Sequence, residues 1–385
     1  MTRTSRAIWE KLRPKAKRLR DRLRSASPRY RYTNLVLPEF KPRAQLVTKV
    51  SEVTTPRFGV IDAHIHLGPP FGGAWSAKPV EALLDALDAA HVRAVVDLDG
   101  GWGEDVLDRH LRHFKERAPE RFVHYGGVDW SRWSEHGDRF GEWAAGRFRQ
   151  QVARGAQGLK IWKPFGLHVR DQHGKLVAVD DERLVPLWET VGELNVPVTI
   201  HVADPVAFFD PLDERNERWE ELHGHPDWRF PSPPYPSFMQ IMGSFANLVR
   251  GHPNTTFVGA HVGCYAENLG WVGALLDECP NFFVDISARM GELGRQPYSA
   301  RRFFLRYQDR ILFGTDADAR LGTYRRYYRF LETDDEYFSY GAGEVPGQGR
   351  WGVYGLYLPD EVLQKVYFRN AERVIWRRPS STSAR

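Results

Sequence analysis

The sequence predicts an α/β protein folded as a (β/α)8 TIM barrel, with a basic N-terminal helical arm and loop insertions at the catalytic face. Short, almost continuously apolar segments alternate with helical patterns between residues 58 and 378. Several of these segments end in a histidine or an aspartate just before a loop. Strands that are apolar along their whole length are typical of parallel sheets covered on both faces. Polar residues at their C-terminal ends are typical of barrel enzymes.

The charge of the chain is unevenly distributed, which suggests three regions. Residues 1–57 are predicted to form a basic arm and leader, residues 58–378 the barrel, and residues 379–385 a disordered tail. Residues 1–50 contain fifteen Lys and Arg but only three acidic residues, a net charge of +12. Because the whole chain carries +5, the remainder carries −7, and the basic character belongs to the arm.

Residues 1–26 have the pattern of a basic amphipathic helix, with apolar residues three or four positions apart on one stripe. Such a helix could bind an anionic membrane surface, nucleic acid, the barrel or a second subunit of a homo-oligomer, or it could remain a mobile arm. Docking and mobility are favoured over membrane or nucleic-acid binding, and no specific nucleic-acid recognition is predicted. The stripe consists of Ile8, Leu12, Ala16, Leu19 and Leu23.

Eight strands are predicted in the barrel region, each a run of apolar and β-branched residues. They cover residues 60–68, 92–98, 122–128, 158–162, 198–202, 257–263, 282–287 and 311–315. Helices are predicted between them, among them residues 79–90, 104–117 and 186–194. Pro79 favours the start of the first of these helices.

Composition also indicates where the protein works. No apolar run reaches the roughly 18 residues that a membrane span needs, and no apolar core of a secretory signal follows the basic N-terminus. The only cysteines are Cys264 and Cys279, so no disulfide framework is expected and a cytoplasmic location is predicted. Cys264 is interpreted as a loop or packing residue.

The first predicted strand contains two histidines at alternate positions, His64 and His66. Side chains on one face of a strand repeat every second residue, so the two rings are expected to be neighbours. Two adjacent imidazoles at a strand end can bind one metal ion. The alternative, two buried core histidines, is disfavoured because an apolar strand seldom carries two of them.

Three later strands supply further polar residues at their C-terminal ends: His201, His261 and Asp316. Their separations in the sequence are too long for a local metal finger and suit strands divided by helices and insertions. Together with His64 and His66 they form a candidate metal centre.

The order of these motifs resembles the amidohydrolase superfamily: HxH, then His, then His, then Gly314-Thr315-Asp316 after the last strand. The best match is the amidohydrolase-related branch of metal-dependent hydrolases that includes the aminocarboxymuconate-semialdehyde decarboxylase type. Residues 370–373 (NAER) resemble the last helix of that branch. The resemblance covers residues 58–376 and implies a barrel with a bound metal, but it does not define the substrate.

The resemblance also implies roles for the five residues. His64, His66 and His201 would be metal ligands, and Asp316 a ligand or the acceptor of a proton from bound water. His261 would act beside the ion as an acid/base or carbonyl-polarising group. One divalent ion is expected, zinc first because a nitrogen-rich donor set suits it, and manganese second.

Three further residues are candidates for binding substrate. Lys160 lies on the fourth predicted strand, on the same face as Trp162. Some superfamily members carboxylate a lysine there to bridge two metals; a lysine that binds a substrate anion or a neighbouring carboxylate is the favoured interpretation. Arg289, just past the seventh strand, could anchor an anion or form a structural salt bridge.

Two long insertions follow His201 and Asp316, over residues 203–236 and up to about residue 358. Both are rich in aromatic residues. Long loops at the catalytic end often form a lid or a substrate pocket, although most of these aromatic residues are expected to pack on the barrel.

The predicted function is hydrolysis of an amide, lactone or ester of a small molecule by metal-activated water. A metal-dependent, non-oxidative decarboxylase (a lyase) is the first alternative, because the same residues could serve both reactions. The second alternative is an inactive barrel that acts as a binding protein, which the presence of all five site residues disfavours.

Overall fold

The computed structural model describes residues 14, 15, 17, 18, 20, 35–69 and 74–376, which belong to two units, residues 1–47 and residues 48–385. In the described part of the first unit, residues 14, 15, 17, 18 and 20 are helical and exposed, and a short helical turn covers Leu37–Glu39. The apolar stripe predicted for residues 1–26 and the tail predicted for residues 379–385 lie outside the described residues, so both remain predictions.

All eight predicted strands are present in the second unit, in the predicted order, and all neighbours are parallel. They form two sheets, β1-β2-β3 and β4-β5-β6-β7-β8. Isolated parallel bridges pair Gly126 with Leu159 and Ile65 with Ala317, at the two seams between the sheets. The strands are β1 Val60–Ile65, β2 Val92–Asp97, β3 Phe122–His124, β4 Leu159–Ile161, β5 Val198–Ile200, β6 Phe257–Gly259, β7 Phe282–Asp285 and β8 Ile311–Leu312.

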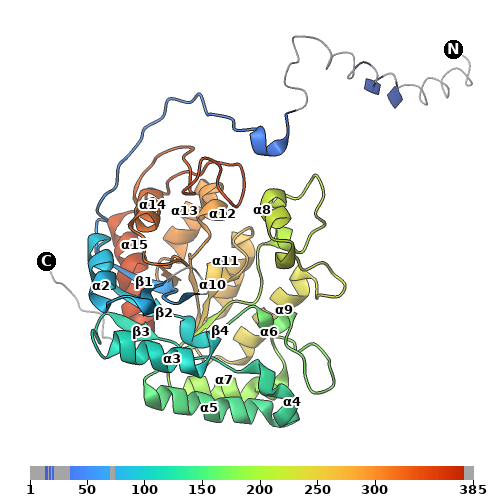
Figure 1. Cartoon of the computed structure of the whole chain (residues 1–385), viewed down its shortest axis with the longest axis vertical. Helices are drawn as coiled ribbons and strands as arrows, with labels where there is room; N and C mark the ends of the chain where they lie inside the picture. Colours follow the sequence, from blue (N-terminus) through green and yellow to red (C-terminus); the bar gives the residue numbers. More distant parts are fainter. Residues whose placement is uncertain (1–13, 16, 19, 21–34, 70–73, 377–385) are drawn as a thin grey trace, which may run out of the picture. The chain divides into compact units, whose positions relative to one another are not determined.

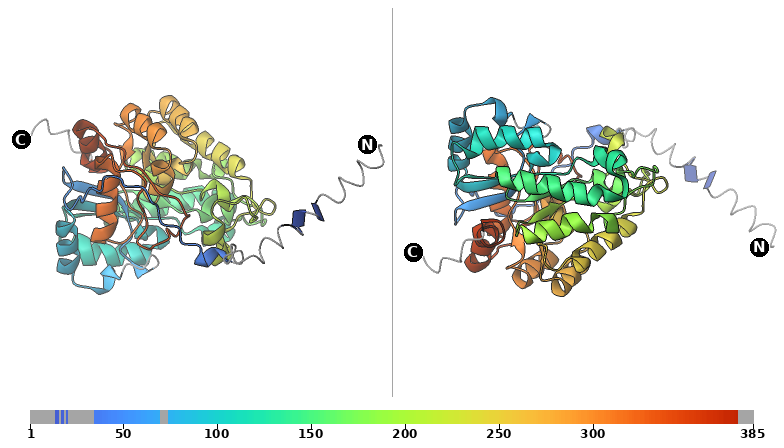
Figure 2. Two further views of the ribbon diagram at one scale, coloured as in Figure 1. Left: turned by 90° about the horizontal axis from the view of Figure 1, so that it is seen from above. Right: turned by 90° about the horizontal axis from the view of Figure 1, so that it is seen from below.

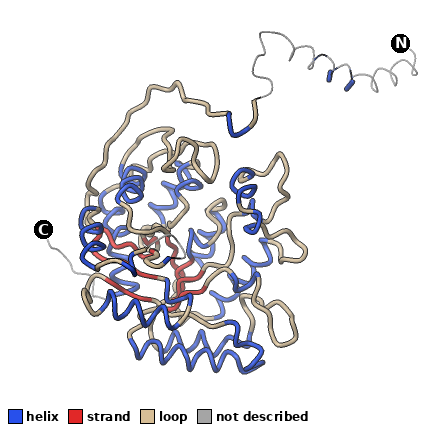
Figure 3. The backbone as a smooth tube through the Cα atoms, viewed as in Figure 1, coloured by secondary structure: helices blue, strands red, loops and turns tan. Residues whose placement is uncertain are grey.

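Helices follow the strands and surround them in the second unit (Figures 1 and 3). Figure 2 shows α5 and α7 side by side along one flank of this unit. The helices are α2 Val80–Ala89, α3 Glu104–His110, α4 Trp133–His136, α5 Phe140–Arg154, α6 Pro164–Leu167, α7 Val185–Glu193, α8 Trp219–Gly224, α9 Phe238–Gly251, α10 Ala260–Gly263, α11 Leu269–Glu278, α12 Met290–Gly294, α13 Pro297–Arg306, α14 Leu321–Glu332 and α15 Asp360–Gln364.

Local sequence signals explain several helix boundaries. α9 begins with a capping box, in which the Ser237 side chain accepts from the Gln240 amide and the Gln240 side chain accepts from the Ser237 amide. α5 ends at Gly155, whose φ of 122° a side chain would disfavour. The helix predicted over residues 104–117 is α3, continued by a wider π turn over Leu111–Lys115.

The strands divide their apolar side chains between two clusters, as alternation along a strand requires. The smaller cluster collects residues from strands of both sheets, which is the arrangement of side chains that fill a barrel interior. The C-terminal segment packs against it. Its members are Ile61, Ala63, Ala94, Val96, Leu98, Val123, Tyr125, Val258, Phe283, Leu312, Ala371, Val374 and Ile375.

Residues 48–57, which the sequence assigns to the leader, belong to the second unit and bond to its C-terminal part. The Ser51 amide and hydroxyl both donate to the Asp335 carboxylate at 2.7 Å. Arg57 donates through its amide to Glu332 at 3.1 Å and through Nη1 to Asp360 at 2.6 Å. None of the helices in the described part of the chain combines the length and apolar character needed to cross a membrane.

Candidate metal centre

The histidine and aspartate side chains predicted from the sequence converge at the C-terminal ends of the strands. His64 lies in β1 and His66 just after it, while His201 follows β5 and Asp316 follows β8. His261 directly follows β6, in the short turn α10. All four histidines are buried, and the Asp316 side chain is 18% exposed. The adjacency of His64 and His66 is as predicted, with ring centroids 5.5 Å apart.

Asp316 lies at the centre of the group. Its Oδ1 is 3.2 Å from Nε2 of His64 and 3.0 Å from Nε2 of His66, and its Oδ2 is 3.7 Å from Nε2 of His261. The backbone of Asp316 is left-handed, with a φ of 55°, and its amide donates to the His64 carbonyl at 2.8 Å. A non-glycine residue in this conformation is strained, and such strain is common at functional sites.

Two further carboxylates orient the ligand rings from behind. Nδ1 of His64 lies 2.9 Å from Asp285, and Nδ1 of His66 lies 2.6 Å from Asp99. In the neutral form of each ring, Nδ1 donates to its carboxylate and Nε2 keeps a lone pair that could bind an ion. Asp99 and Asp285 are not among the functional residues predicted from the sequence. Asp285 ends β7 and Asp99 follows β2, so the placement at strand ends that identified Asp316 was available for both.

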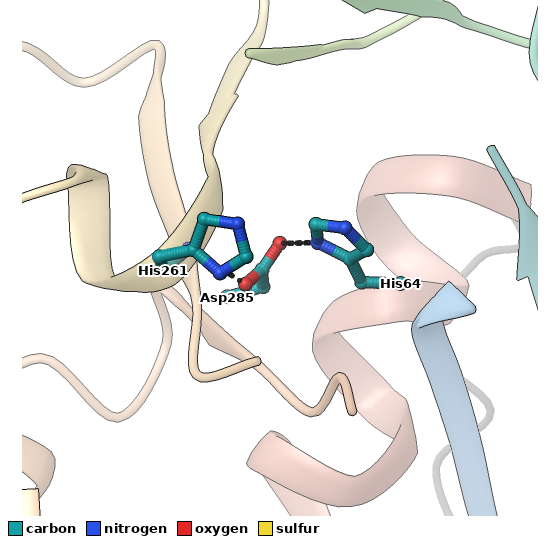
Figure 4. Close-up of side chains that lie close together, drawn as sticks. All are labelled: His64, His261 and Asp285. Carbon is teal, nitrogen blue, oxygen red and sulfur yellow. Dashed lines mark hydrogen bonds and ion pairs between the residues drawn. The ribbon is translucent and has the colours of Figure 1, made fainter. Parts of the chain in front are cut away.

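His261 is held by the β7 end. Its amide donates to Asp285 Oδ1 at 3.0 Å, and its Nδ1 lies 2.9 Å from the carbonyl of Ser287. Figure 4 shows Asp285 between the rings of His64 and His261. The backbone of His261 is left-handed, with a φ of 58°, so the strand predicted to continue to residue 263 ends at Gly259. Donation from Nδ1 to the Ser287 carbonyl leaves Nε2 to accept a proton.

His201 lies beside His261, with ring centroids 4.4 Å apart. Its Nε2 is 3.4 Å from Asp204, which Lys163 holds at 2.5 Å. Burial lowers the pKa of His201 to about 4, so its ring is neutral near pH 7, as a metal ligand must be. Donor atoms of His64, His66 and Asp316 all lie within 4.8 Å of one another, and His201 belongs to none of the donor groups found among the described residues. Its role as a ligand remains a prediction.

The donors fit a divalent cation. Nε2 of His64 is buried and has no hydrogen-bond partner within the described part of the chain. The 3.0 and 3.2 Å separations from Asp316 are close to the roughly 3.3 Å between ligands on a tetrahedral ion with bonds of about 2.0 Å. Burial lowers the pKa of His66, but hydrogen bonds to Asp316 and Asp99 outweigh it and raise this pKa to about 9. The negative charge of Asp316 and Asp99, which raises this pKa, also favours a bound metal cation.

A separate histidine–carboxylate cluster supports the loop that carries Asp99. Nδ1 of His110 and Nδ1 of His124 lie 2.7 and 2.8 Å from one oxygen of Asp97. These separations are those of hydrogen bonds and are short for two ligands of one ion. The other oxygen of Asp97 accepts from the Asp99 amide at 3.2 Å. The cluster therefore connects α3 and β3 to the carboxylate that orients His66.

The three candidate substrate residues have different surroundings. Lys160 is 1% exposed, and its Nζ lies 4.6 Å from the ring centroid of Trp162. Nζ of Lys160 has no hydrogen-bond partner among the described residues. The Trp162 ring lies 5.2 Å from that of His66. Arg289 is 6% exposed and donates to the carbonyl of Ala288 at 2.9 Å.

Both insertions border a cavity of about 460 Å³ beside the metal centre. Glu220, Glu221 and Trp228 come from the first insertion, and Tyr340 and Gln348 from the second. The cavity reaches the last strands through Ala288 and Thr315, next to Ser287 and Asp316. The two insertions therefore form part of the wall of a cavity, as the prediction of a pocket required.

Salt bridges hold the first insertion in place. Arg218, which is 1% exposed, pairs with Glu292 of α12 and, at 2.8 Å, with Glu221. Arg350 of the second insertion pairs with Glu220 at 2.5 Å. The second insertion is not loop alone, since it includes the twelve-residue helix α14.

Comparisons with known proteins identify the family and the fold. A family model described as amidohydrolase matches residues 61–375. The structure of 2,6-dihydroxybenzoate decarboxylase from Rhizobium is similar, with a TM-score of 0.53 and 16% identity over 83% of this chain and 99% of that chain. No match is found among curated protein sequences.

Two further solved structures show the same fold. Dihydroxybenzoic acid decarboxylase from Polaromonas sp. JS666, with bound manganese and the inhibitor 2-nitroresorcinol, has a TM-score of 0.51 and 14% identity over 84% of this chain and 98% of that chain. A TIM-barrel protein from Bordetella bronchiseptica has a TM-score of 0.50 and 15% identity over 82% and 98% of the two chains. These similarities confirm the predicted fold class, and the match over residues 61–375 shows that the chain belongs to the amidohydrolase family of metal-dependent enzymes.

Proposed function

We propose that this protein is a metal-dependent, non-oxidative decarboxylase of a small carboxylic acid. The sequence favours hydrolysis over decarboxylation, whereas the comparisons favour decarboxylation. Two of the similar structures are decarboxylases of dihydroxybenzoic acids. The observation in this chain that carries the proposal is the buried ammonium group of Lys160.

Lys160 has the character of a carboxylate-binding residue. A buried cation is costly unless it is paired, and the Lys160 Nζ has no hydrogen-bond partner in the described part of the chain. Burial lowers the pKa of Lys160 to about 8, so most of the amine is still charged at pH 7. A substrate carboxylate would supply the missing partner, whereas a neutral amide, lactone or ester would not.

One divalent ion is proposed at the centre, held by His64, His66 and Asp316, with His201 as the expected further ligand. When bound, it would supply a Lewis acid that polarises substrate oxygens. Imidazole nitrogens suit zinc, and the manganese bound in the Polaromonas relative makes manganese an equally strong candidate.

The residues around the ion supply binding and proton transfer. In the proposed reaction the bond between the substrate carbon and its carboxylate breaks, CO2 leaves, and a proton from solvent replaces it on carbon. Lys160 would hold the carboxylate. His261 would carry the proton at Nε2, because its Nδ1 is bonded to the Ser287 carbonyl at 2.9 Å.

Hydrolysis is the second candidate, and Asp316 is the observation that favours it. Burial raises the pKa of Asp316, but His64 and His261 outweigh burial and lower it well below its usual range. Asp316 is therefore ionised near neutral pH and could take a proton from an attacking water.

The test is incubation of the metal-loaded protein with a panel of aromatic and aliphatic carboxylic acids, esters, lactones and amides. We expect CO2 release from at least one acid. Lys160→Met should raise KM for that acid at least about tenfold, the loss expected for a hydrogen bond to a charged group, while metal content stays constant. Lys175→Met, at an exposed position, is the matched control. Turnover confined to esters, lactones or amides without CO2 release would contradict the proposal.

A further inference from the structure

One arginine in the wall of the cavity between the two insertions has no carboxylate partner. Arg326 lies on α14, in the second insertion, and lines this cavity. Its Nη2 donates to the Thr323 hydroxyl at 3.2 Å, and no acidic side chain of the described residues lies within ion-pair distance of its guanidinium group. Arg329, on the same helix, pairs instead with the buried Asp335 at 2.7 Å.

The positive charge of Arg326 is partly removed from water. The side chain is half-buried, and burial lowers its pKa below the usual value. Among the described residues, Tyr327 is the one neighbour whose charge interaction opposes this shift. A guanidinium group stays charged at neutral pH, so its lost hydration is left without a compensating anion.

The carboxylates in the same cavity wall are already bonded to other arginines. Both oxygens of Glu220 accept from Arg350, at 2.5 and 2.8 Å. Glu221 accepts from Arg218 at 2.8 Å. Neither of these two arginines lines the cavity. Among the described Lys, Arg, Asp and Glu residues of the lining, the charge of Arg326 is therefore the unpaired one.

The same cavity leads from Arg326 to the metal centre. Tyr327, Ala288 and Thr315 also line it, and Thr315 directly precedes Asp316. Its volume of about 460 Å³ is within the range of roughly 300–1,000 Å³ that small-molecule sites occupy. A small acid bound at the metal centre can therefore extend into this cavity toward Arg326.

The surroundings of Arg326 suit a carboxylate better than a dianion. The planar fork of a guanidinium group matches the two oxygens of a carboxylate. Glu220 and Glu221 of the first insertion line the same cavity, and their negative charge disfavours a second charge on the bound group. One arginine is thus matched by one monoanionic group.

We propose that Arg326 is a specificity-determining residue, which binds a second carboxylate of the substrate. The substrate would then be a small dicarboxylic acid whose second carboxylate remains on the product. This inference rests on the proposed function, because the first carboxylate is the one assigned to Lys160.

The test compares each diacid with its own monomethyl ester, which has nearly the same shape and one charge fewer. The probes are isophthalate, terephthalate and adipate, titrated calorimetrically into the full-length, metal-loaded protein. We expect at least one diacid to bind at least about tenfold more tightly than its monoester, the gain expected for a hydrogen bond to a charged group. Arg326→Gln should abolish this preference, and Arg326→Lys should restore part of it.

Two further variants serve as controls, and metal content is measured on all of them. Arg325→Gln changes the exposed neighbour of Arg326 on α14 and should keep the preference of the parent. Lys160→Met should weaken the diacid and the monoester alike, because both contain the carboxylate assigned to Lys160.

The inference and the proposed function fail in different ways. The inference is overturned if no diacid binds more tightly than its monoester, or if Arg326→Gln keeps the preference with its metal bound, even where a monocarboxylic acid releases CO2. A preference that depends on Arg326, without CO2 release from any acid, would support the carboxylate site and refute decarboxylation.

Discussion

At the scale of single residues, each ring that faces Asp316 from β1 is fixed by a second carboxylate. His66 is the clearer case, because Asp99 bonds its Nδ1 at 2.6 Å and also accepts from the amides of Leu67 and Gly68 at 2.9 and 2.6 Å. Asp99 thus holds the ring and the backbone beside it in one arrangement. A ligand that is already oriented loses less entropy when the ion binds.

Replacing Asp99 should therefore weaken metal binding without removing a ligand. For Asp99→Asn we expect a loss of about 10–100-fold in metal affinity, the usual effect of changing a group that orients a metal-binding histidine. Titration with Zn²⁺ or Mn²⁺ against a competing chelator measures it. Asp105→Asn, in the first turn of α3 and paired with Arg109, serves as control. Equal affinities for the two variants would show that Asp99 does not orient His66.

His261 should act without holding the ion. His261→Asn keeps much of the side-chain volume but cannot move a proton near neutral pH. We expect it to retain bound metal and lose activity by at least about 10²–10⁴-fold, the usual contribution of a placed proton-transfer group. His201→Asn should instead lose metal affinity. Metal analysis and turnover on both variants decide the matter; a metal-free His261→Asn, or one as active as the parent, would refute the assignment.

The sequence predicted the residues of the metal centre better than the carboxylates that orient its histidines. His64 and His66 follow from the two-residue period of a strand, and Asp316 from its place after the last strand. Asp99 and Asp285 were missed because a buried aspartate at a strand end looks the same whether it binds an ion or orients a ligand. The left-handed backbone of Asp316 could not be foreseen, because it depends on the hydrogen bond from its amide to His64.

At the scale of elements, α3 and β3 are joined to the end of β2 by a buried ion pair. Burial raises the pKa of Asp97, but pairing with His110 and His124 lowers it far below its usual range. Burial lowers the pKa of His110, but Asp97 outweighs it and raises this pKa above its usual value. Removing one partner of such a pair typically costs about 3–5 kcal/mol.

The stability that this pair contributes should depend on pH in two directions. The lowered pKa of Asp97 stabilises the fold above its unfolded-state pKa of about 4, and this part is lost as pH falls. The raised pKa of His110 stabilises the fold below its unfolded-state pKa of about 6.5, and this part is lost as pH rises through the folded-state value. The pair therefore contributes most between about pH 4 and 6.5.

Denaturant unfolding at pH 5 and pH 8 tests this dependence. The difference in unfolding free energy between the parent and His110→Gln should be larger at pH 5 than at pH 8. His173→Gln, at an exposed position, should show little difference at either pH. A cost for His110→Gln that is constant, or greater at pH 8, would mean that His110 is not charged in the folded protein.

The lengths of the elements were less predictable than their order. The strand predicted over residues 257–263 stops at Gly259, because His261 and Val262 both adopt left-handed backbone conformations. The insertion predicted after Asp316 contains helix α14, whose buried face includes Tyr324, Tyr327 and Tyr328. Three of its buried positions are tyrosines among arginines, so its hydrophobic period was hard to recognise in the sequence.

At the scale of the whole molecule, the basic arm is expected to be dispensable for chemistry. Deleting residues 1–26 or 1–47 should leave metal content and turnover nearly unchanged, because the second unit begins at Thr48. Deleting residues 1–57 should lower the unfolding free energy by about 1–3 kcal/mol, since it removes the Ser51 donors of the buried Asp335. Thermal unfolding, metal analysis and turnover of the three truncations compare them. Loss of activity on deleting residues 1–26 would place the arm in the core or in an obligate interface.

The family and the barrel could be predicted from the sequence because they depend on motif order and strand periodicity, which are local properties. Two questions depend on distances between residues far apart in the chain. One is whether His201 is a ligand of the ion. The other is whether Lys160 binds a substrate or is itself carboxylated and bridges a second ion. We expect His64, His66 and Asp316 to hold one divalent ion. Metal analysis of the purified full-length protein should give close to one ion per chain. Two ions with a carboxylated Lys160, or no ion after metal loading, would refute this assignment.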